Sequence, residues 1–105
     1  MDLPQLKGPE SQQEEVLQVY EKLSKILTSY GLSASGLQLR DNQSWVLLLA
    51  NGTKVYLGKK ELSSRLLRFC KAYPAVFAEK EERLASVDLR YLRGMAVQWK
   101  QQTGR

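Results

Sequence analysis

The 105-residue sequence predicts an α+β fold in which two helices pack on one β-sheet. Apolar residues recur every three or four positions in two segments, which is the spacing of an amphipathic helix. In the middle and at the end of the chain they alternate with other residues, as in strands. The predicted order is an N-terminal helix, a three-stranded antiparallel meander, a second helix and a C-terminal β-hairpin. A chain of this length with 43% hydrophobic residues, without repeats or low-complexity linkers, fits a single domain over residues 1–105.

An extended lead-in and a helix are expected at the N-terminus. The lead-in is Leu3–Leu6, which contains a proline. Ser11 followed three residues later by Glu14 makes a capping box, and Gly31 supplies a C-cap. We therefore predict a helix from about Ser11 to Tyr30. Its apolar stripe consists of Val16, Val19, Tyr20, Leu23, Ile26, Leu27 and Tyr30.

Three antiparallel strands are predicted in the middle of the chain. Leu37 and Leu39 alternate with polar residues and mark the first. The run Trp45–Leu49 is apolar at every position, which predicts a central strand buried on both faces. Asn51-Gly52 then predicts a two-residue type I′ turn, which requires positive φ at both positions. The third strand is Val55-Tyr56-Leu57.

A second helix is predicted after Gly58. Its apolar stripe consists of Leu62, Leu66, Phe69, Tyr73 and Phe77. Pro74 has no N–H for the Cys70 carbonyl, so we expect the helix to kink or restart near Tyr73-Pro74. Cys70 is the only cysteine, which excludes an internal disulfide and a thiolate metal cluster. Its apolar neighbours predict a small, buried, structural side chain.

The stretch from Val87 to Lys100 predicts a β-hairpin around a glycine-containing turn. In the first strand Val87, Leu89 and Tyr91 would share one face. In the second, Met95, Val97 and Trp99 would lie opposite Ala96, Gln98 and Lys100, and Trp99 is assigned to the core. Unless an earlier strand pairs with it, the second strand is a sheet edge with unpaired backbone donors and acceptors. Such an edge can dock another chain.

Charge divides the chain into two unlike halves. Residues 1–53 carry four basic and six acidic side chains, whereas residues 54–105 carry twelve and five, a net charge of +7. A basic half attracts nucleic acid, anionic lipid headgroups or an acidic protein segment. Arg65, Arg68 and Lys71 share one side of the second helix and could contact phosphates, but no nucleic-acid-binding motif accompanies them. Solvated cations are the better interpretation, and a small basic nucleic-acid-binding domain is kept as the alternative function.

The residues on which most catalytic sites depend are missing from this sequence. It has no histidine, which removes the commonest general base and the usual zinc and triad arrangements. Neither G-x-x-x-x-G-K-[ST] nor G-x-G-x-x-G occurs. We therefore expect no enzyme activity, no cofactor and no metal. No apolar run reaches the ~18 residues of a membrane span, and the first ten residues do not form a signal peptide.

Four motifs follow one another along the chain. They are LPQLKGPE at 3–10, SWVLLLANGTKVYLG at 44–58, RLLRFCKAYP at 65–74 and VDLRY..G.AV.W at 87–99. Together they resemble the periplasmic β domain of the FtsQ family of bacterial cell-division proteins. The last motif is the most specific, and the resemblance covers nearly the whole chain.

The resemblance implies a role and a place in the cell. FtsQ-like proteins have a short cytoplasmic tail, one transmembrane helix, a POTRA subdomain and then this β domain at the periplasmic face of the inner membrane. They are non-enzymatic scaffolds of the divisome, which forms the septum, and they connect its components chiefly through FtsB and, through FtsB, FtsL. This chain would be a soluble C-terminal fragment without the tail, the membrane helix, the POTRA part and the first β-domain strands. Its open sheet edges could lead to self-association.

The resemblance also places a partner-binding site in the closing hairpin. In such proteins the terminal strand accepts a segment of FtsB by β-augmentation, in which main-chain bonds give affinity and alternate side chains give specificity. Tyr91 would supply a large amphipathic contact, Gly94 a close backbone approach, and Met95 and Ala96 the start of the strand. Arg90 would pair with an FtsB carboxylate. The other interpretation is that Tyr91 packs inside and Arg90 only serves solubility.

One position departs from the family pattern. Relatives can carry a basic residue two positions before the Ser-Trp pair, where it can form a salt bridge with FtsB, but this chain has Asn42. Arg40 or Arg93 could take over that contact. We therefore expect a partner whose acidic contacts have shifted. The predicted partner-binding residues are Arg90, Tyr91, Arg93, Gly94, Met95 and Ala96.

Overall fold

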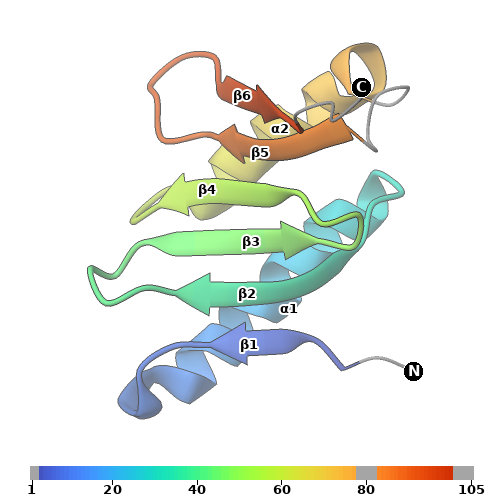
Figure 1. The fold of residues 1–105 in the computed structure, drawn as a ribbon. Helices are drawn as coiled ribbons and strands as arrows, with labels where there is room; N and C mark the ends of the chain where they lie inside the picture. The colour runs from blue at the N-terminus through green and yellow to red at the C-terminus, as the bar shows by residue number, and fades with distance from the viewer. Residues whose placement is uncertain (1–2, 78–82, 101–105) are drawn as a thin grey trace, which may run out of the picture.

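The computed structural model describes residues 3–77 and 83–100. In chain order its elements are β1 (Gln5–Lys7), the short 3-10 helix η1 (Glu10–Gln12), α1 (Gln13–Ser29), β2 (Ala34–Leu39), β3 (Trp45–Leu49), β4 (Lys54–Gly58), α2 (Leu62–Val76), β5 (Leu84–Asp88) and β6 (Ala96–Trp99). The α+β fold class is confirmed (Figure 1). The lead-in differs from the expectation because part of it forms a strand.

Six strands form one mixed sheet in the order β1-β2-β3-β4-β5-β6. The pairs β1–β2 and β4–β5 are parallel, and the other neighbours are antiparallel. Parallel neighbours need a long crossover, and α1 and α2 supply the two crossovers. Both helices lie on the same face of the sheet (Figure 1). No helix of the described residues covers the other face.

The hydrophobic core lies between the helices and the sheet. Both predicted apolar stripes face it, because Leu23 and Leu27 of α1 and Leu66 and Phe69 of α2 are fully buried. The prediction that Tyr30 extends the first stripe is wrong, because Tyr30 follows the end of α1 and is exposed. The rings of the α2 stripe pack on one another with centroids 5.4–5.9 Å apart. The buried hydrophobic residues are Val16, Leu23, Leu27, Leu37, Leu39, Trp45, Val46, Leu47, Leu49, Val55, Leu57, Leu66, Phe69, Cys70, Tyr73, Phe77, Leu84, Val87 and Leu89.

β1 joins the sheet because β2 lets it approach closely. Leu6 is in register with Leu37, and Gln5 is in register with Gly36. A Cβ added at Gly36 would lie 2.5 Å from the Gln5 carbonyl oxygen. Only glycine therefore fits at this contact between β1 and β2 without a shift of one strand.

The predicted capping box at the start of α1 does not form. The helix begins at Gln13 without a side-chain cap, and Ser11 lies in η1. The Gln13 carboxamide instead donates to the carbonyls of Gly8 at 2.8 Å and Pro9 at 3.1 Å. The 3-10 turn tightens the chain before the first α-helical turn, so Ser11 cannot serve as the N-cap. At the other end Gly31, with a φ of +76°, terminates the helix as predicted.

The predicted type I′ turn after β3 is also wrong. Gly52 has a φ of +93°, but Asn51 does not have positive φ. The Gly52 N–H donates to the Leu49 carbonyl at 2.9 Å, which is the pattern of a three-residue loop with its last residue in a left-handed conformation. The Asn51 side chain accepts the Thr53 N–H at 3.0 Å and holds this geometry.

Pro74 does not restart α2. The helix continues to Val76, and the Phe77 N–H donates to the Tyr73 carbonyl at 2.9 Å. Proline has no N–H for the Cys70 carbonyl, but the helix passes through this position without a break. Cys70 is fully buried, as predicted, and desolvation raises the pKa of its thiol to about 11.

Candidate functional site: the C-terminal sheet edge

β6 forms one edge of the sheet. It pairs with β5, in the register Val87 to Val97, and no other strand of the described chain lies beyond it. The Lys100 N–H donates to the Arg83 carbonyl at 2.6 Å, so the backbone groups of residue 100 point toward β5. Backbone groups alternate in direction along a strand, so the N–H and C=O of Val97 point away from β5. They lie where an added strand would bond.

The connection between β5 and β6 is longer than the sequence predicts. β5 ends at Asp88 and β6 begins at Ala96, which leaves seven residues, the 89–95 loop, between them. Tyr91 lies in this loop rather than in a strand, and 54% of it is exposed. The interpretation in which Tyr91 packs inside is therefore wrong. Leu92 beside it is 90% exposed, so the loop presents two large apolar side chains to solvent.

The other predicted site residues have different exposures. Arg93 and Gly94 are exposed in the loop, and Gly94 has a φ of +73° that favours glycine. Met95 is half-buried and packs against the core, whereas Ala96 is exposed at the start of β6. Only part of the Met95 side chain is therefore accessible to a partner.

The prediction that Trp99 lies in the core is wrong. Its ring centroid lies 6.2 Å from that of Phe77, but 39% of the residue remains exposed. An edge strand has a neighbour on one side only, which explains the exposure.

Arg90 is engaged within the chain. Its Nε donates to Asp88 Oδ1 at 2.8 Å and its Nη2 to Oδ2 at 2.6 Å. These hydrogen bonds are the main reason that the pKa of Asp88 is lowered and that of Arg90 raised. The guanidinium carbon also lies 5.6 Å from the centre of the Tyr56 ring. A partner carboxylate would therefore share Arg90 with Asp88.

Sequence reasoning missed the contacts that Arg68 of α2 makes with the 89–95 loop. Its Nη1 donates to the Leu92 carbonyl at 3.0 Å, and its Nη2 donates to the carbonyls of Leu89 at 2.9 Å and Tyr91 at 3.0 Å. One guanidinium thus joins the helix to the loop through three hydrogen bonds. The planar fork of arginine suits several acceptors at once.

The basic side of α2 is not a row of solvated cations, and this interpretation was wrong for two of its three members. Arg65 Nη1 donates to the Leu57 carbonyl, and Arg68 is held by the loop. Lys71 alone of the three is exposed. The choice of arginine over lysine beside the apolar stripe was the available signal, since arginine is the residue that bonds several carbonyls.

Asn42 has a structural role in the turn between β2 and β3. Its side-chain oxygen accepts the Ser44 N–H at 3.1 Å and the Ser44 hydroxyl at 2.7 Å. Gln43 completes the turn with a φ of +71°. Of the two suggested replacements for a basic contact, Arg40 lies beside this turn and Arg93 lies in the 89–95 loop.

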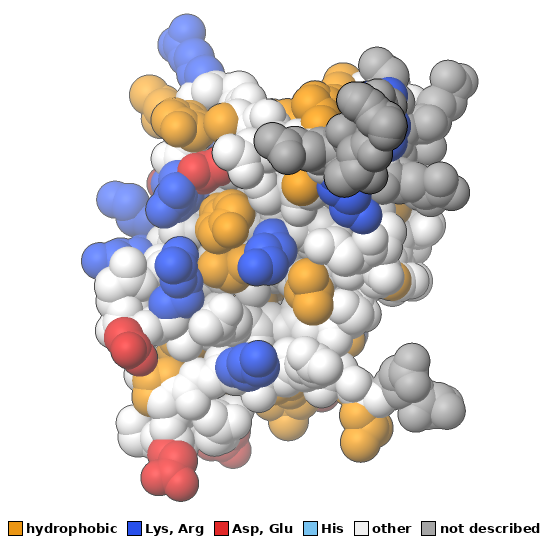
Figure 2. Space-filling view, in the orientation of Figure 1, with side chains coloured by type: hydrophobic (Ala, Val, Ile, Leu, Met, Phe, Trp, Pro, Cys, Tyr) orange, Lys and Arg blue, Asp and Glu red, His pale blue; other side chains and the backbone are white. Residues whose placement is uncertain are grey.

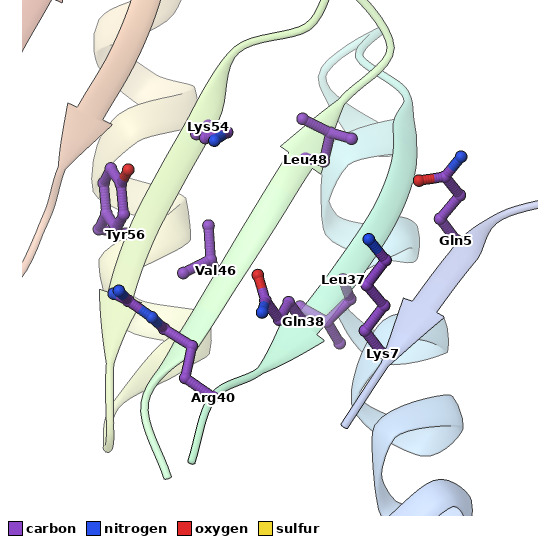
Figure 3. A pocket seen from close by; sticks show the side chains of 9 residues that line it. All are labelled: Gln5, Lys7, Leu37, Gln38, Arg40, Val46, Leu48, Lys54 and Tyr56. Atoms are coloured by element: carbon purple, nitrogen blue, oxygen red, sulfur yellow. The ribbon is translucent and has the colours of Figure 1, made fainter. Parts of the chain in front are cut away.

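The helix-free face of the sheet carries basic side chains around an apolar centre (Figure 2). Register places Lys7, Gln38, Val46 and Tyr56 in one row across β1 to β4. These residues, with Gln5, Leu37, Arg40, Leu48 and Lys54, line a hollow of about 280 Å³ (Figure 3). No Asp or Glu of the described residues lines it.

No helix in 3–77 or 83–100 is long and apolar enough to span a membrane. Within the same ranges no three His, Cys, Asp or Glu side chains gather as metal ligands.

The fold and the site define a class of small α+β proteins whose sheet has helices on one face and an open strand at its edge. A family model described as "Cell division protein FtsQ/DivIB, C-terminal" matches residues 1–90. The chain therefore belongs to the FtsQ/DivIB family of cell-division proteins. Among the predicted site residues, Arg90 lies inside the matched range and Tyr91 to Ala96 follow it.

Curated relatives agree with this assignment. The "Cell division protein FtsQ" of Coxiella burnetii is 33% identical over 99 residues, which are 94% of this chain and 41% of the relative. That of Shewanella oneidensis is 36% identical over 97 residues, 92% of this chain and 37% of the relative. That of Escherichia coli K12 is 36% identical over 100 residues, 92% of this chain and 36% of the relative. The chain thus spans 36–41% of the length of these relatives.

Proposed function

We propose that this chain is a single, truncated FtsQ-like β domain that acts as a non-enzymatic scaffold of the divisome. In this proposal the full-length protein is anchored in the inner membrane, and residues 1–105 lie on its periplasmic face. The domain binds FtsB, and FtsL through FtsB, by strand addition at β6. The observation that carries the proposal is the open edge of β6 next to an exposed loop. Membership of a cell-division family supports the cellular role.

In this mechanism the partner adds a seventh strand beside β6. The outward N–H and C=O of Val97 supply main-chain bonds, which give affinity without sequence preference. Specificity comes from side chains that the partner can reach. Tyr91 is the main apolar contact because it is large and exposed, and Gly94 allows the two backbones to approach.

Arg93 is the best replacement for the basic contact absent at Asn42. It is exposed, and it has no ion pair among the described residues. Arg40 follows β2, four strand spacings from β6, or about 19 Å at ~4.8 Å per spacing. A strand that adds to β6 therefore reaches Arg93 far more easily than Arg40. We expect an acidic residue of FtsB to face Arg93.

Calorimetric titration with a peptide from the membrane-distal periplasmic part of the cognate FtsB tests the proposal. Tyr91→Ala and Met95→Glu should each weaken binding by at least about tenfold, since both alter the contact region. Tyr30→Ala removes a tyrosine of similar exposure, 40%, at the end of α1 and is the matched control. Equal affinities for wild type and the three variants would show that the proposed site is wrong.

Charge reversals separate the two candidate basic contacts. Arg93→Glu should weaken peptide binding and reduce its dependence on salt, whereas Arg40→Glu should leave both unchanged. The opposite result would move the acidic contact to the turn between β2 and β3.

An oligonucleotide titration tests the alternative function. Two of the three side chains that could have contacted phosphates, Arg65 and Arg68, are bonded to carbonyls, which weakens that alternative. Tight binding that falls steeply with salt would revive it.

A further inference from the structure

We propose that Arg68 is a positioning residue for the partner-binding edge. It holds the carbonyls of Leu89, Tyr91 and Leu92, so that the 89–95 loop already has its binding conformation before a strand is added. This inference rests on the proposed function, and it adds a residue that does not touch the partner.

The loop has few other restraints. Residues 91–94 form no regular structure and are all exposed, so burial does not hold them in place. No backbone–backbone hydrogen bond ties residues 91–94 to the rest of the described chain. The ion pair of Arg90 with Asp88 restrains only the beginning of the loop. Arg68 is thus the tether that reaches its middle, at Tyr91 and Leu92.

Arg68 is itself held on a rigid support. The next residue, Phe69, is fully buried and packs against Tyr73 and Phe77. One turn earlier, Arg65 joins α2 to the end of β4 through the Leu57 carbonyl. The position of α2 is therefore transmitted to the loop through the Arg68 side chain.

The orientation of the three carbonyls explains how the loop displays its side chains. With the carbonyls of Tyr91 and Leu92 turned toward Arg68, the side chains of these residues extend into solvent, 54% and 90% exposed. The arrangement leaves Arg68 Nε buried without a hydrogen-bond partner among residues 3–77 and 83–100, which is unfavourable for folding. The two terminal nitrogens of the Arg68 guanidinium thus bind the loop carbonyls, while its Nε–H stays without an acceptor.

A preformed loop favours strand addition because ordering a flexible segment opposes binding. Without Arg68, the partner would have to order Tyr91 to Gly94 when it binds. Arg68→Ala should therefore weaken FtsB-peptide binding by about tenfold or more, although the residue lies outside the interface. The salt dependence of binding should not change, since Arg68 does not contact the peptide's charges.

NMR relaxation of the backbone amides in the free protein tests the loop independently of any partner. In wild type the order parameters of residues 91–94 should approach the ~0.85 of rigid backbone, and in Arg68→Ala they should fall below about 0.6, while Val87 and Val97 in the paired strands stay near 0.85. Lys71→Ala is the matched control, because it removes one exposed positive charge from the same helix. It should leave the order parameters of the loop unchanged and alter affinity by less than about twofold.

Arg68→Lys keeps the charge but not the planar guanidinium, and it serves as a second variant if Arg68→Ala does not fold. It should fall between wild type and alanine in both the order parameters of the loop and the affinity. Unchanged order parameters in Arg68→Ala overturn the inference, as does a more mobile loop with unchanged affinity. If the wild-type protein does not bind the peptide, the proposed function fails and the positioning role fails with it. A more mobile loop in Arg68→Ala would then locate the error in the partner rather than in the contacts of Arg68.

Discussion

Asp88 and Arg90 form a doubly hydrogen-bonded ion pair where β5 ends, with donor–acceptor distances of 2.8 and 2.6 Å. The Arg90 backbone N–H also donates to Asp88 Oδ1 at 3.0 Å, so one carboxylate binds both the main chain and the side chain two residues later. This local bonding turns the chain out of β5. It explains why the strand stops before Tyr91, although the alternation of apolar residues continues to that position.

Asp88→Asn should destabilise the protein at neutral pH and alter its acid unfolding. The pKa of Asp88 is lowered in the folded state, so its contribution is complete at pH 7. That contribution is lost as the pH falls below the ordinary aspartate value of ~3.9 and through the lowered folded-state pKa. We expect the variant to be about 0.5–1 kcal/mol less stable at pH 7, with a smaller decrease on acidification.

Urea unfolding at a series of pH values between 7 and 3 measures this effect. Asp41→Asn is the control, because Asp41 is exposed and has no ion pair within the described residues. Parallel stability curves for wild type and Asp88→Asn would show that the pair contributes nothing.

Gln43→Gly should stabilise the protein. Gln43 has a φ of +71°, which costs a residue with a side chain about 1–2 kcal/mol relative to glycine. The variant also loses the exposed hydrogen bonds between the side-chain amides of Gln43 and Gln12, and its unfolded chain is more flexible. We expect a net gain of up to about 1 kcal/mol in the free energy of unfolding. Gly52→Ala, at positive φ in the other turn, should lose about as much, and a loss in both variants would contradict the argument.

Local patterns explain why most of the fold could be predicted from sequence. The apolar stripes of α1 and α2 and the strands β2 to β4 are set by side-chain periodicity within each segment. Leu23, Leu27, Leu66 and Phe69 were placed in the core on that basis, and all are fully buried. The buried face of a helix or strand can be identified from its own sequence, without knowing which element packs against it.

The errors arise where a distant or competing contact decides the structure. β1 depends on the close approach of Gln5 to Gly36, which are far apart in sequence. In place of the capping box, the Gln13 side chain binds the preceding carbonyls. In place of the type I′ turn, a three-residue loop forms that the Asn51 side chain holds. None of these contacts leaves a periodic signal.

The candidate site was predicted only in part for the same reason. The alternation in the last motif indicated a strand at Ala96–Trp99, and β6 is that strand. The contacts of Arg68 with the 89–95 loop were missed because a side chain that bonds carbonyls 21 to 24 residues away produces no local pattern. Hydrogen bonds between a helix and a loop become visible only in three dimensions.

Gly36→Ala should weaken the attachment of β1. The added methyl group would lie 2.5 Å from the Gln5 carbonyl oxygen, so one strand must shift. We expect a loss of about 1–3 kcal/mol, as for other overpacked sites, and faster amide exchange in residues 5–7. Gln38→Ala is the control, since Gln38 is exposed two residues further along β2. Unchanged exchange in β1 would show that the strand can move aside at no cost.

Cys70 should resist alkylation in the folded protein. It is fully buried, and desolvation raises the pKa of its thiol from 9.0 to about 11. Since the thiolate is the reactive form, this shift alone lowers the reactive fraction at pH 8 by about 100-fold. Labelling with iodoacetamide, followed by mass spectrometry, should therefore be at least that much slower in buffer than in urea. Thr28→Cys in a Cys70→Ala background places a thiol at an exposed position of α1 and should label quickly in both. Rapid labelling of Cys70 in the folded protein would mean that α2 opens far more often than its packing against the sheet implies.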